Sequence, residues 1–189
     1  MTTASDGATR ILDVAEAMIR VQGFNGFSFR EIAKDVGVKS STVHYYYPTK
    51  ADLGVAVTRR YTERFLATLG DPTDAPGDAD AVLEAFRRPF HNALSGKRRM
   101  CLCGMLGAEI GDLPPEVAAE TARFFERITA WLVAALSRTS WGERTTAETI
   151  RRIALRTLAT LEGALILAHA LDDATLFDAI DLDRLAPAS

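Results

Sequence analysis

The residue types that most often carry out chemistry are thinly spread along this chain. Its three histidines, His44, His91 and His169, lie far apart in the sequence, and none belongs to an H-E-x-x-H or Glu-x-x-His pattern. The chain also lacks a phosphate-binding P-loop, a G-x-G-x-x-G turn and a G-x-S-x-G nucleophile turn. We therefore predict no metal site and no cofactor, and we expect that the protein is not an enzyme.

Cys101 and Cys103 are the chain's two thiols, and three cations precede them at residues 97–99. Nearby positive charge lowers the pKa of a thiol, so sensing of oxidants or electrophiles is one interpretation. Two cysteines spaced two residues apart on a helix point in different directions and are poorly placed to form a disulfide. We favour the other interpretation, in which both are buried and inert.

Basic, hydroxyl and aromatic side chains are instead concentrated at residues 28–50, SFREIAKDVGVKSSTVHYYYPTK. Residues 1–60 carry eight Lys or Arg against six Asp or Glu, whereas the remainder carries fourteen against nineteen, which gives the net charge of −3. A mildly basic N-terminal part on an acidic body is consistent with contact to a polyanion such as nucleic acid.

The composition is that of an ordinary soluble globular protein, with 48% hydrophobic and 25% charged residues in a chain of 189. Charges interrupt every apolar run before the roughly 18 residues that a membrane span needs. The first ten residues are polar and lack the apolar core of a signal peptide. We expect a cytoplasmic protein with no membrane partner.

Helical periodicity recurs along the chain and strand-like alternation is nearly absent, so we predict an all-α fold. Ser28 and Glu31 form a capping box, and Gly37 ends that helix. Ser40 is expected to cap the next helix, and Thr145 with Glu148 a later one. About nine helices are predicted, at residues 8–22, 28–36, 40–47, 49–69, 81–95, 100–110, 114–138, 145–171 and 175–185.

The segment at residues 70–80, GDPTDAPGDAD, is rich in Gly, Pro and Asp and reads as a linker. It separates a predicted N-terminal domain at residues 1–69, which includes a connecting helix at 49–69, from a C-terminal domain at residues 81–189.

Residues 29–50 have the pattern of two short helices joined by a tight turn. Ala33 provides a small side chain where the helices cross, and Gly37, four positions later, tolerates the positive φ that the turn requires. Four apolar side chains are spaced to face inward: Ile32, Val36, Val38 and Val43. This pattern is typical of a helix-turn-helix, whose second helix enters the major groove of DNA.

The stretch at residues 8–56 resembles the DNA-binding domain of the TetR/AcrR family of bacterial transcriptional regulators. The matching positions are the helix at Ile11, Gly26-Phe27-Ser28, Ile32-Ala33, Gly37-Val38, Ser41-Thr42-Val43, Tyr45, Tyr47-Pro48 and Lys50. The body resembles the family in its architecture, including a late long helix with the sequence LEGALILAHAL at residues 161–171. The resemblance implies an all-α homodimer with a variable C-terminal pocket and repression that a small molecule relieves.

The resemblance also implies which residues contact DNA, and His44 stands where relatives commonly have Tyr. Ser40 acting only as a cap, Arg30 as a solvated charge and His44 as a surface imidazole remain alternatives. Phe24, Phe27, Phe29 and Tyr47 are expected in the core. The predicted DNA-binding residues are Ser28, Arg30, Lys39, Ser40, Ser41, Thr42, His44, Tyr45 and Lys50.

The helix predicted at residues 145–171 is apolar on two sides. One stripe comprises Ile150, Ile153, Ala154, Thr157, Leu158, Leu161 and Leu165, and a second comprises Leu155, Ala159, Ile166 and Ala170. A helix that is apolar on two sides must cover both of them. We predict that the second stripe meets another copy of the chain, and the alternative is a helix buried centrally in a monomer.

The C-terminal domain is rich in large apolar residues, most of which build a core. The kink or break expected at Pro89 and the two glycines Gly104 and Gly107 could leave a cavity for a small-molecule effector. His91, Glu162 and His169 are the polar candidates to orient it, although solvent exposure or an ordinary partner is the alternative for each. The candidate ligand-binding residues are Phe86, Phe90, His91, Cys103, Phe124, Trp131, Glu162 and His169.

The function that this sequence favours is a ligand-responsive transcriptional regulator, a repressor that binds a palindromic operator in double-stranded DNA as a dimer. The alternatives are a helical enzyme, for which no clustered carboxylates or nucleophile–base pair is visible, and a protein-interaction module.

Overall fold

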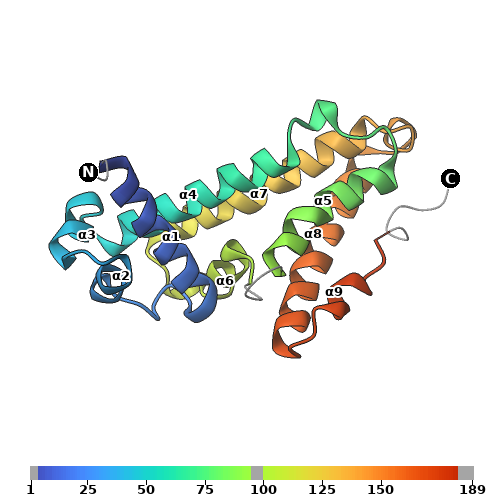
Figure 1. Cartoon of the computed structure of the whole chain (residues 1–189). Coiled ribbons are helices and arrows are strands. Elements are labelled where there is room, and N and C mark those ends of the chain that lie inside the picture. The colour runs from blue at the N-terminus through green and yellow to red at the C-terminus, as the bar shows by residue number, and fades with distance from the viewer. Residues whose placement is uncertain (1–3, 95–99, 183–189) are drawn as a thin grey trace. The chain divides into compact units, whose positions relative to one another are not determined.

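The computed structural model describes residues 4–94 and 100–182, with side chains from residue 6 onward. Within these residues the chain forms nine α-helices and three short 3-10 helices, and no strand (Figure 1). The all-α prediction is therefore confirmed. The α-helices are α1 (Ala4–Gln22), α2 (Phe29–Val36), α3 (Ser40–Tyr46), α4 (Lys50–Leu69), α5 (Ala79–Leu94), α6 (Leu102–Ala108), α7 (Pro115–Ser137), α8 (Ala147–Ala170) and α9 (Thr175–Asp178).

The described residues pack as two compact units. The first unit lies within Met1–Thr62 and Leu102–Phe124, and the second lies within Glu63–Cys101 and Phe125–Ser189. Helices α4 and α7 each contribute residues to both units. Residues 102–124 thus pack with the N-terminal helices, although the predicted boundaries at 1–69, 70–80 and 81–189 place them in the C-terminal domain. Those boundaries divide the chain by function and stay a prediction.

The start of α2 forms as the sequence predicts. The Ser28 hydroxyl accepts from the backbone N–H of Glu31, and the Glu31 carboxylate accepts from the backbone N–H of Ser28 at 2.7 Å. Gly37 ends α2 with φ of 78°, a conformation that glycine adopts at no steric cost. The next cap is different. Lys39, not Ser40, is the N-cap of α3, and Lys39 makes no side-chain capping bond.

Other element boundaries also differ from the prediction, and α5 continues through Pro89 without a break. Thr146, not Thr145, caps α8 and accepts from the backbone N–H of Thr149, while the Thr145 hydroxyl donates to the Trp141 carbonyl. The predicted linker is partly ordered: Asp71 caps the 3-10 helix η1 (Pro72–Asp74), and α5 begins at Ala79. The helix predicted at residues 175–185 ends at Asp178 in the structure, and residues 179–182 are not helical. The cations at residues 97–99 and residues 183–185 lie outside the described residues.

The core of the first unit is built from one apolar face of each of its helices. The inward positions predicted for the helix-turn-helix are buried at Ile32, Val36 and Val43 and half-buried at Val38. Phe24 and Phe27 are buried, as expected. Phe29 is only half-buried, and its ring lies 4.6 Å from that of His44, so the prediction that Phe29 is a core residue is wrong. These buried faces pack α2 against α1 and against α3.

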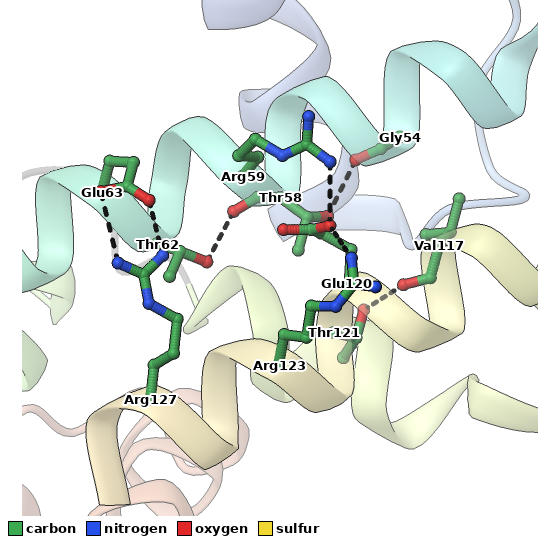
Figure 2. Close-up of polar contacts among 10 residues, drawn as sticks. All are labelled: Gly54, Thr58, Arg59, Thr62, Glu63, Val117, Glu120, Thr121, Arg123 and Arg127. Carbon is green, nitrogen blue, oxygen red and sulfur yellow. Dashed lines mark hydrogen bonds and ion pairs between the residues drawn. The ribbon is translucent and has the colours of Figure 1, made fainter. Parts of the chain in front are cut away.

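Helices α4 and α7 approach each other through small residues and hydroxyls (Figure 2). A Cβ added to Gly54 would lie 2.9 Å from a Val117 methyl and 2.7 Å from the Phe24 ring, so only glycine fits there. The buried hydroxyls of Thr58 and Thr121 donate to the carbonyls one turn earlier on their own helices. This arrangement satisfies the polar groups and keeps the two helix backbones close.

An ion-pair cluster runs beside this contact in the first unit. Glu120 is buried, and its Oε2 accepts from Arg59 at 3.2 Å and from Arg123 at 2.9 Å (Figure 2). Within the second unit, Glu63 of α4 pairs with Arg127 of α7. Both arginines on Glu120 are largely exposed, whereas the Glu120 carboxylate is buried and depends on them to compensate its charge.

Helix α8 has one buried and one exposed apolar side. All seven residues of the first predicted stripe are buried, whereas Leu155 is 45% exposed and Ile166 is 54% exposed. By length and composition alone, α8 is the one helix among the described residues that could span a membrane. Core helices of soluble proteins meet the same criteria, and Arg156 and Glu162 interrupt its apolar sequence.

A Gly54→Ala substitution tests the close approach of α4 and α7. Replacing a glycine inside a helix by alanine ordinarily gains about 0.5–1 kcal/mol. Here the added methyl group overlaps Val117 and Phe24, and we expect a net loss of about 1–2 kcal/mol in the free energy of unfolding. Urea denaturation measures the change, and an increase in stability would contradict the packing described.

Candidate nucleic-acid interface

The candidate interface is the helix-turn-helix formed by α2, the turn at Gly37 and α3. Within the turn, the backbone N–H of Gly37 and that of Val38 donate to the Ala33 carbonyl at 3.0 and 2.9 Å. The guanidinium of Arg10, on α1, donates to the Val36 carbonyl at 2.6 Å. These bonds satisfy the last carbonyls of α2 and fix the direction in which the chain enters α3.

One buried side chain orients α3. Val43 is fully buried, and Ser41, His44 and Tyr45 of this short helix are exposed to solvent. Tyr45 is 82% exposed, which is unusual for an aromatic side chain on a helix that packs into a core. Of the predicted DNA-binding residues on or next to α3, Lys39, Ser41, His44 and Tyr45 are exposed, and Ser40 and Thr42 are half-buried.

The other aromatic residues of α3 are engaged with the protein. Tyr46 lies against α1, where a Cβ on Gly7 would be 3.3 Å from the Tyr46 hydroxyl, and its ring meets that of Tyr45 edge-on. Tyr47 directly follows α3 and is only half-buried, so the prediction that it is a core residue is also wrong; the loss of solvent raises the pKa of its phenol. His44 packs on Phe29, with Nδ1 3.4 Å from the Pro48 carbonyl oxygen. Tyr45 is therefore the α3 aromatic most available to a partner.

The N-terminus of α2 presents two further predicted contacts. Ser28 and Arg30 are both exposed there. The hydrogen bonds from Ser28 lower the pKa of Glu31, so this carboxylate stays charged and bound to the helix end at neutral pH. A helix N-terminus favours anions, and an exposed Arg next to it adds a second attraction for phosphate.

Lys50 has a structural role in addition to any contact with DNA. Its ammonium donates to the Phe27 carbonyl at 2.6 Å and lies 4.3 Å from the centre of the Phe27 ring. Partial burial lowers the pKa of Lys50, and the charges of Glu31 and Glu109 oppose that shift. The prediction that Lys50 binds phosphate remains open, because the bond to Phe27 uses one of the ammonium's three donors.

The structure divides the candidate ligand-binding residues between the two units. Cys103 and Phe124 belong to the first unit and are buried there. The other six belong to the second unit. Phe86 stacks on Trp131 with ring centres 6.1 Å apart and meets Phe90 at 5.6 Å, and all three are buried. The role of the eight residues in ligand binding stays a prediction.

The polar candidates of the second unit differ sharply in environment. His91 and His169 are exposed, and His91 lies 3.4 Å from Asp178. Glu162, in contrast, has both carboxylate oxygens shielded from solvent, and neither accepts a well-formed hydrogen bond. Burial raises the pKa of Glu162 to about 7, and the nearby Cys101 thiol offsets this only in part. Sequence reasoning named Glu162, but only the fold shows its isolation.

Sequence reasoning missed an apolar groove between α7 and α8 in the second unit. Its walls include Phe125, Thr129 and Val133 from α7 and Leu155 and Leu158 from α8. The helical spacing of residues 125, 129 and 133 is the signal that could have indicated it. Among the described residues no group of three or more His, Cys, Asp or Glu side chains could hold a metal ion.

Comparison with known proteins shows which family shares this sequence pattern and fold. Residues 11–57 match the family model described as bacterial regulatory proteins of the tetR family. A TetR transcriptional regulator from Legionella pneumophila is 30% identical, with 94% of this chain and 93% of that one aligned and a TM-score of 0.84. The chain belongs to the TetR family of transcriptional regulators. The predicted family and its helix-turn-helix fold are thereby confirmed.

Other members of the TetR family show the same relationship. A TetR-family regulator from Agrobacterium tumefaciens is 28% identical, covers 97% of both chains and has a TM-score of 0.86. The helix-turn-helix regulator YezE of Bacillus subtilis (strain 168) is 31% identical over 108 residues, 56% of this chain and 53% of that protein. The chain thus spans about half the length of the curated relatives that it matches.

A Glu162→Gln substitution tests the environment of this carboxylate. Because burial raises its pKa from 4.5 to about 7, the folded state holds the proton more tightly than the unfolded state between these values. The free energy of unfolding therefore falls as pH rises through this window and levels off above it. Glutamine does not titrate, so we expect the variant to gain about 2 kcal/mol more over the parent at pH 8 than at pH 5.

Urea denaturation at the two pH values measures this difference. Glu148→Gln, which alters an exposed carboxylate on the same helix, is the control. An equal effect of Glu162→Gln at pH 5 and pH 8 would show that Glu162 titrates normally.

Proposed function

We propose that this TetR-family protein binds a palindromic operator in double-stranded DNA as a homodimer, represses transcription there, and is released by a small-molecule effector. The observation that carries the proposal is α3, a short helix fixed by buried Val43 that directs Lys39, Ser41 and Tyr45 to solvent. Such a helix has the dimensions and polarity to enter a major groove. A cytoplasmic location is part of the proposal.

Phosphate contacts would position the protein on the duplex. The exposed cations Arg30 and Lys39 lie at the start of α2 and just before α3, and Ser28 lies at the N-terminus of α2. Binding through such charges weakens steeply as salt concentration rises. Tyr45 and the hydroxyls of Ser41 and Thr42 would then contact base edges or thymine methyl groups.

A second copy of the chain would double these contacts. One recognition helix provides few base contacts, and each good pair gives about 1–3 kcal/mol of discrimination. Leu155 and Ile166, exposed on α8, supply an apolar surface beside the α7–α8 groove. Leu167 and Leu171 extend the exposed apolar surface at the end of α8. Burial of this surface against its symmetry copy would fix the spacing between two α3 helices.

The effector would act by shifting a population. It would bind more tightly to a conformation in which the two α3 helices no longer match the operator spacing. A coupling of about 1–3 kcal/mol changes operator occupancy several-fold. The isolated carboxylate of Glu162 supports an effector site in the second unit, since an effector that donates a hydrogen bond or carries positive charge would satisfy it.

Selection from a random duplex library by the purified full chain tests the proposed function. We expect one inverted-repeat sequence to be enriched, and only an unlabelled duplex of the same sequence to compete for binding. Failure to enrich any duplex would overturn the proposal in favour of an enzyme or a protein-interaction module.

Tyr45→Ala and Lys39→Ala variants test the DNA-facing side of α3. We expect each substitution to weaken binding to the selected duplex about tenfold. Lys39→Ala should also reduce the slope of log affinity against log salt concentration by about one, because one phosphate contact is lost. Both side chains are exposed, so the unfolding temperature should not change. Fluorescence anisotropy at several salt concentrations measures the affinity. Arg144→Ala removes an exposed cation in the second unit and should bind like the parent. Parent-like binding by both α3 variants would exclude this face.

An Ile166→Glu variant tests the dimer. Two buried charges facing each other across the symmetry axis would prevent association, so we expect the mass of one 20.6 kDa chain instead of two. Light scattering after size exclusion measures the mass. Ile110→Glu changes a similarly exposed isoleucine in the first unit and should leave the dimer intact. A dimeric Ile166→Glu variant would place the interface elsewhere.

A further inference from the structure

Glu109 makes a hydrogen bond within the first unit that joins two segments far apart in sequence. It directly follows α6 and starts the 3-10 helix η2 (Ile110–Asp112). Its Oε2 accepts from the backbone N–H of Phe24 at 2.8 Å, across 85 residues. Phe24 lies in the loop between α1 and α2, so a segment outside the helix-turn-helix caps the chain that leads into it.

The space around this bond is shaped to accept the carboxylate. Gly23 ends α1 with φ of 78°, and a Cβ added there would overlap the Glu109 carboxylate. Glycine at this position therefore meets two requirements, a left-handed backbone and room for the Glu109 side chain. The contact depends on a specific residue on both sides.

A chain of contacts leads from Glu109 to the candidate DNA-binding surface. The Phe24 ring is buried and lies 5.1 Å from the Lys50 ammonium, which itself donates to the Phe27 carbonyl. Phe27 directly precedes Ser28, the N-cap of α2. The Phe24 ring also fills the space that glycine leaves at position 54 of α4. Displacing Phe24 would thus disturb Lys50 and the N-terminus of α2 together.

We propose that Glu109 is a positioning residue for DNA binding: through its bond to the Phe24 amide it holds the α1–α2 loop, Lys50 and the N-terminus of α2 in their DNA-binding arrangement. This inference rests on the proposed function. It assigns to the segment at residues 102–112 a direct part in ordering the helix-turn-helix, although Glu109 carries a charge that repels DNA.

Two conservative variants separate the bond from the charge. Glu109→Asp keeps the charge but withdraws the carboxylate by one methylene group, out of reach of the Phe24 amide. Glu109→Gln loses the charge but keeps an oxygen that can accept the bond. If Glu109 acted only through its charge, Asp would be harmless and Gln would tighten binding to the polyanion. The proposal predicts the reverse order: Glu109→Asp should bind the duplex about tenfold more weakly than the parent, and the affinity of Glu109→Gln should lie within about threefold of the parent's.

The test measures binding of the full-length variants to the duplex selected by the parent protein, by fluorescence anisotropy at fixed salt. Asp112→Ala, which removes an exposed charge from the same 3-10 helix, is the control and should bind at least as tightly as the parent. Amide hydrogen exchange at Phe24, followed by NMR, should accelerate at least tenfold in Glu109→Asp and stay near the parental rate in Glu109→Gln.

The outcomes separate this inference from the proposed function. Weak binding and fast Phe24 exchange in Glu109→Asp, restored in Glu109→Gln, support it. Parental binding by Glu109→Asp, or equal losses in Asp and Gln, overturns it while leaving the proposed function intact. If the parent enriches no duplex, the proposed function and its consequence for Glu109 fail together.

Discussion

The exposure of α3 depends on the burial of its opposite side. A helix of seven residues is not stable alone in water, because the free energy needed to nucleate a helix exceeds the stabilisation that so few hydrogen bonds provide. Val43 anchors it in the core, and the left-handed turn at Gly37 gives it a fixed direction relative to α2. Side chains on its other surface, above all that of Tyr45, are then exposed to solvent. Without the anchor there would be no ordered surface for DNA to meet.

The packing of α4 against α7 depends on one glycine and on hydroxyls that bond within their own helices. Glycine at position 54 lets Phe24 and Val117 reach the helix backbone, and the threonines satisfy their own hydroxyls within their helices. Glu120 is the exception, a buried carboxylate compensated by two arginines that reach in from the surface. Both helices contribute residues to both compact units. They contact each other at Gly54 within the first unit and through the Glu63–Arg127 ion pair within the second.

Glu162 and the exposed side of α8 have the opposite property, since each is only partly complemented within the described residues: the Cys101 thiol compensates the carboxylate in part, and Leu155 and Ile166 are exposed to water. A carboxylate without a partner of good geometry loses its hydration and gains little in return, and so its pKa rises. An apolar helix face open to water forgoes the stabilisation that burial would give. Both features lie in the second unit.

The sequence by itself determined what local chemistry controls: the capping box at Ser28 and Glu31, the glycine turn, the buried helical stripes and the TetR resemblance. It misplaced the caps at Ser40 and Thr145 by one residue. Lys39 is the N-cap of α3 without any side-chain bond, and Thr146 takes the cap position next to Thr145, because only the packed chain fixes which residue stands at a helix end. The tertiary structure alone decided that Phe29 packs beside His44, that Lys50 bonds to Phe27, and that Glu109 reaches the Phe24 amide. Such contacts join residues far apart along the chain, and no periodicity or short motif records which distant atoms folding brings within hydrogen-bond distance.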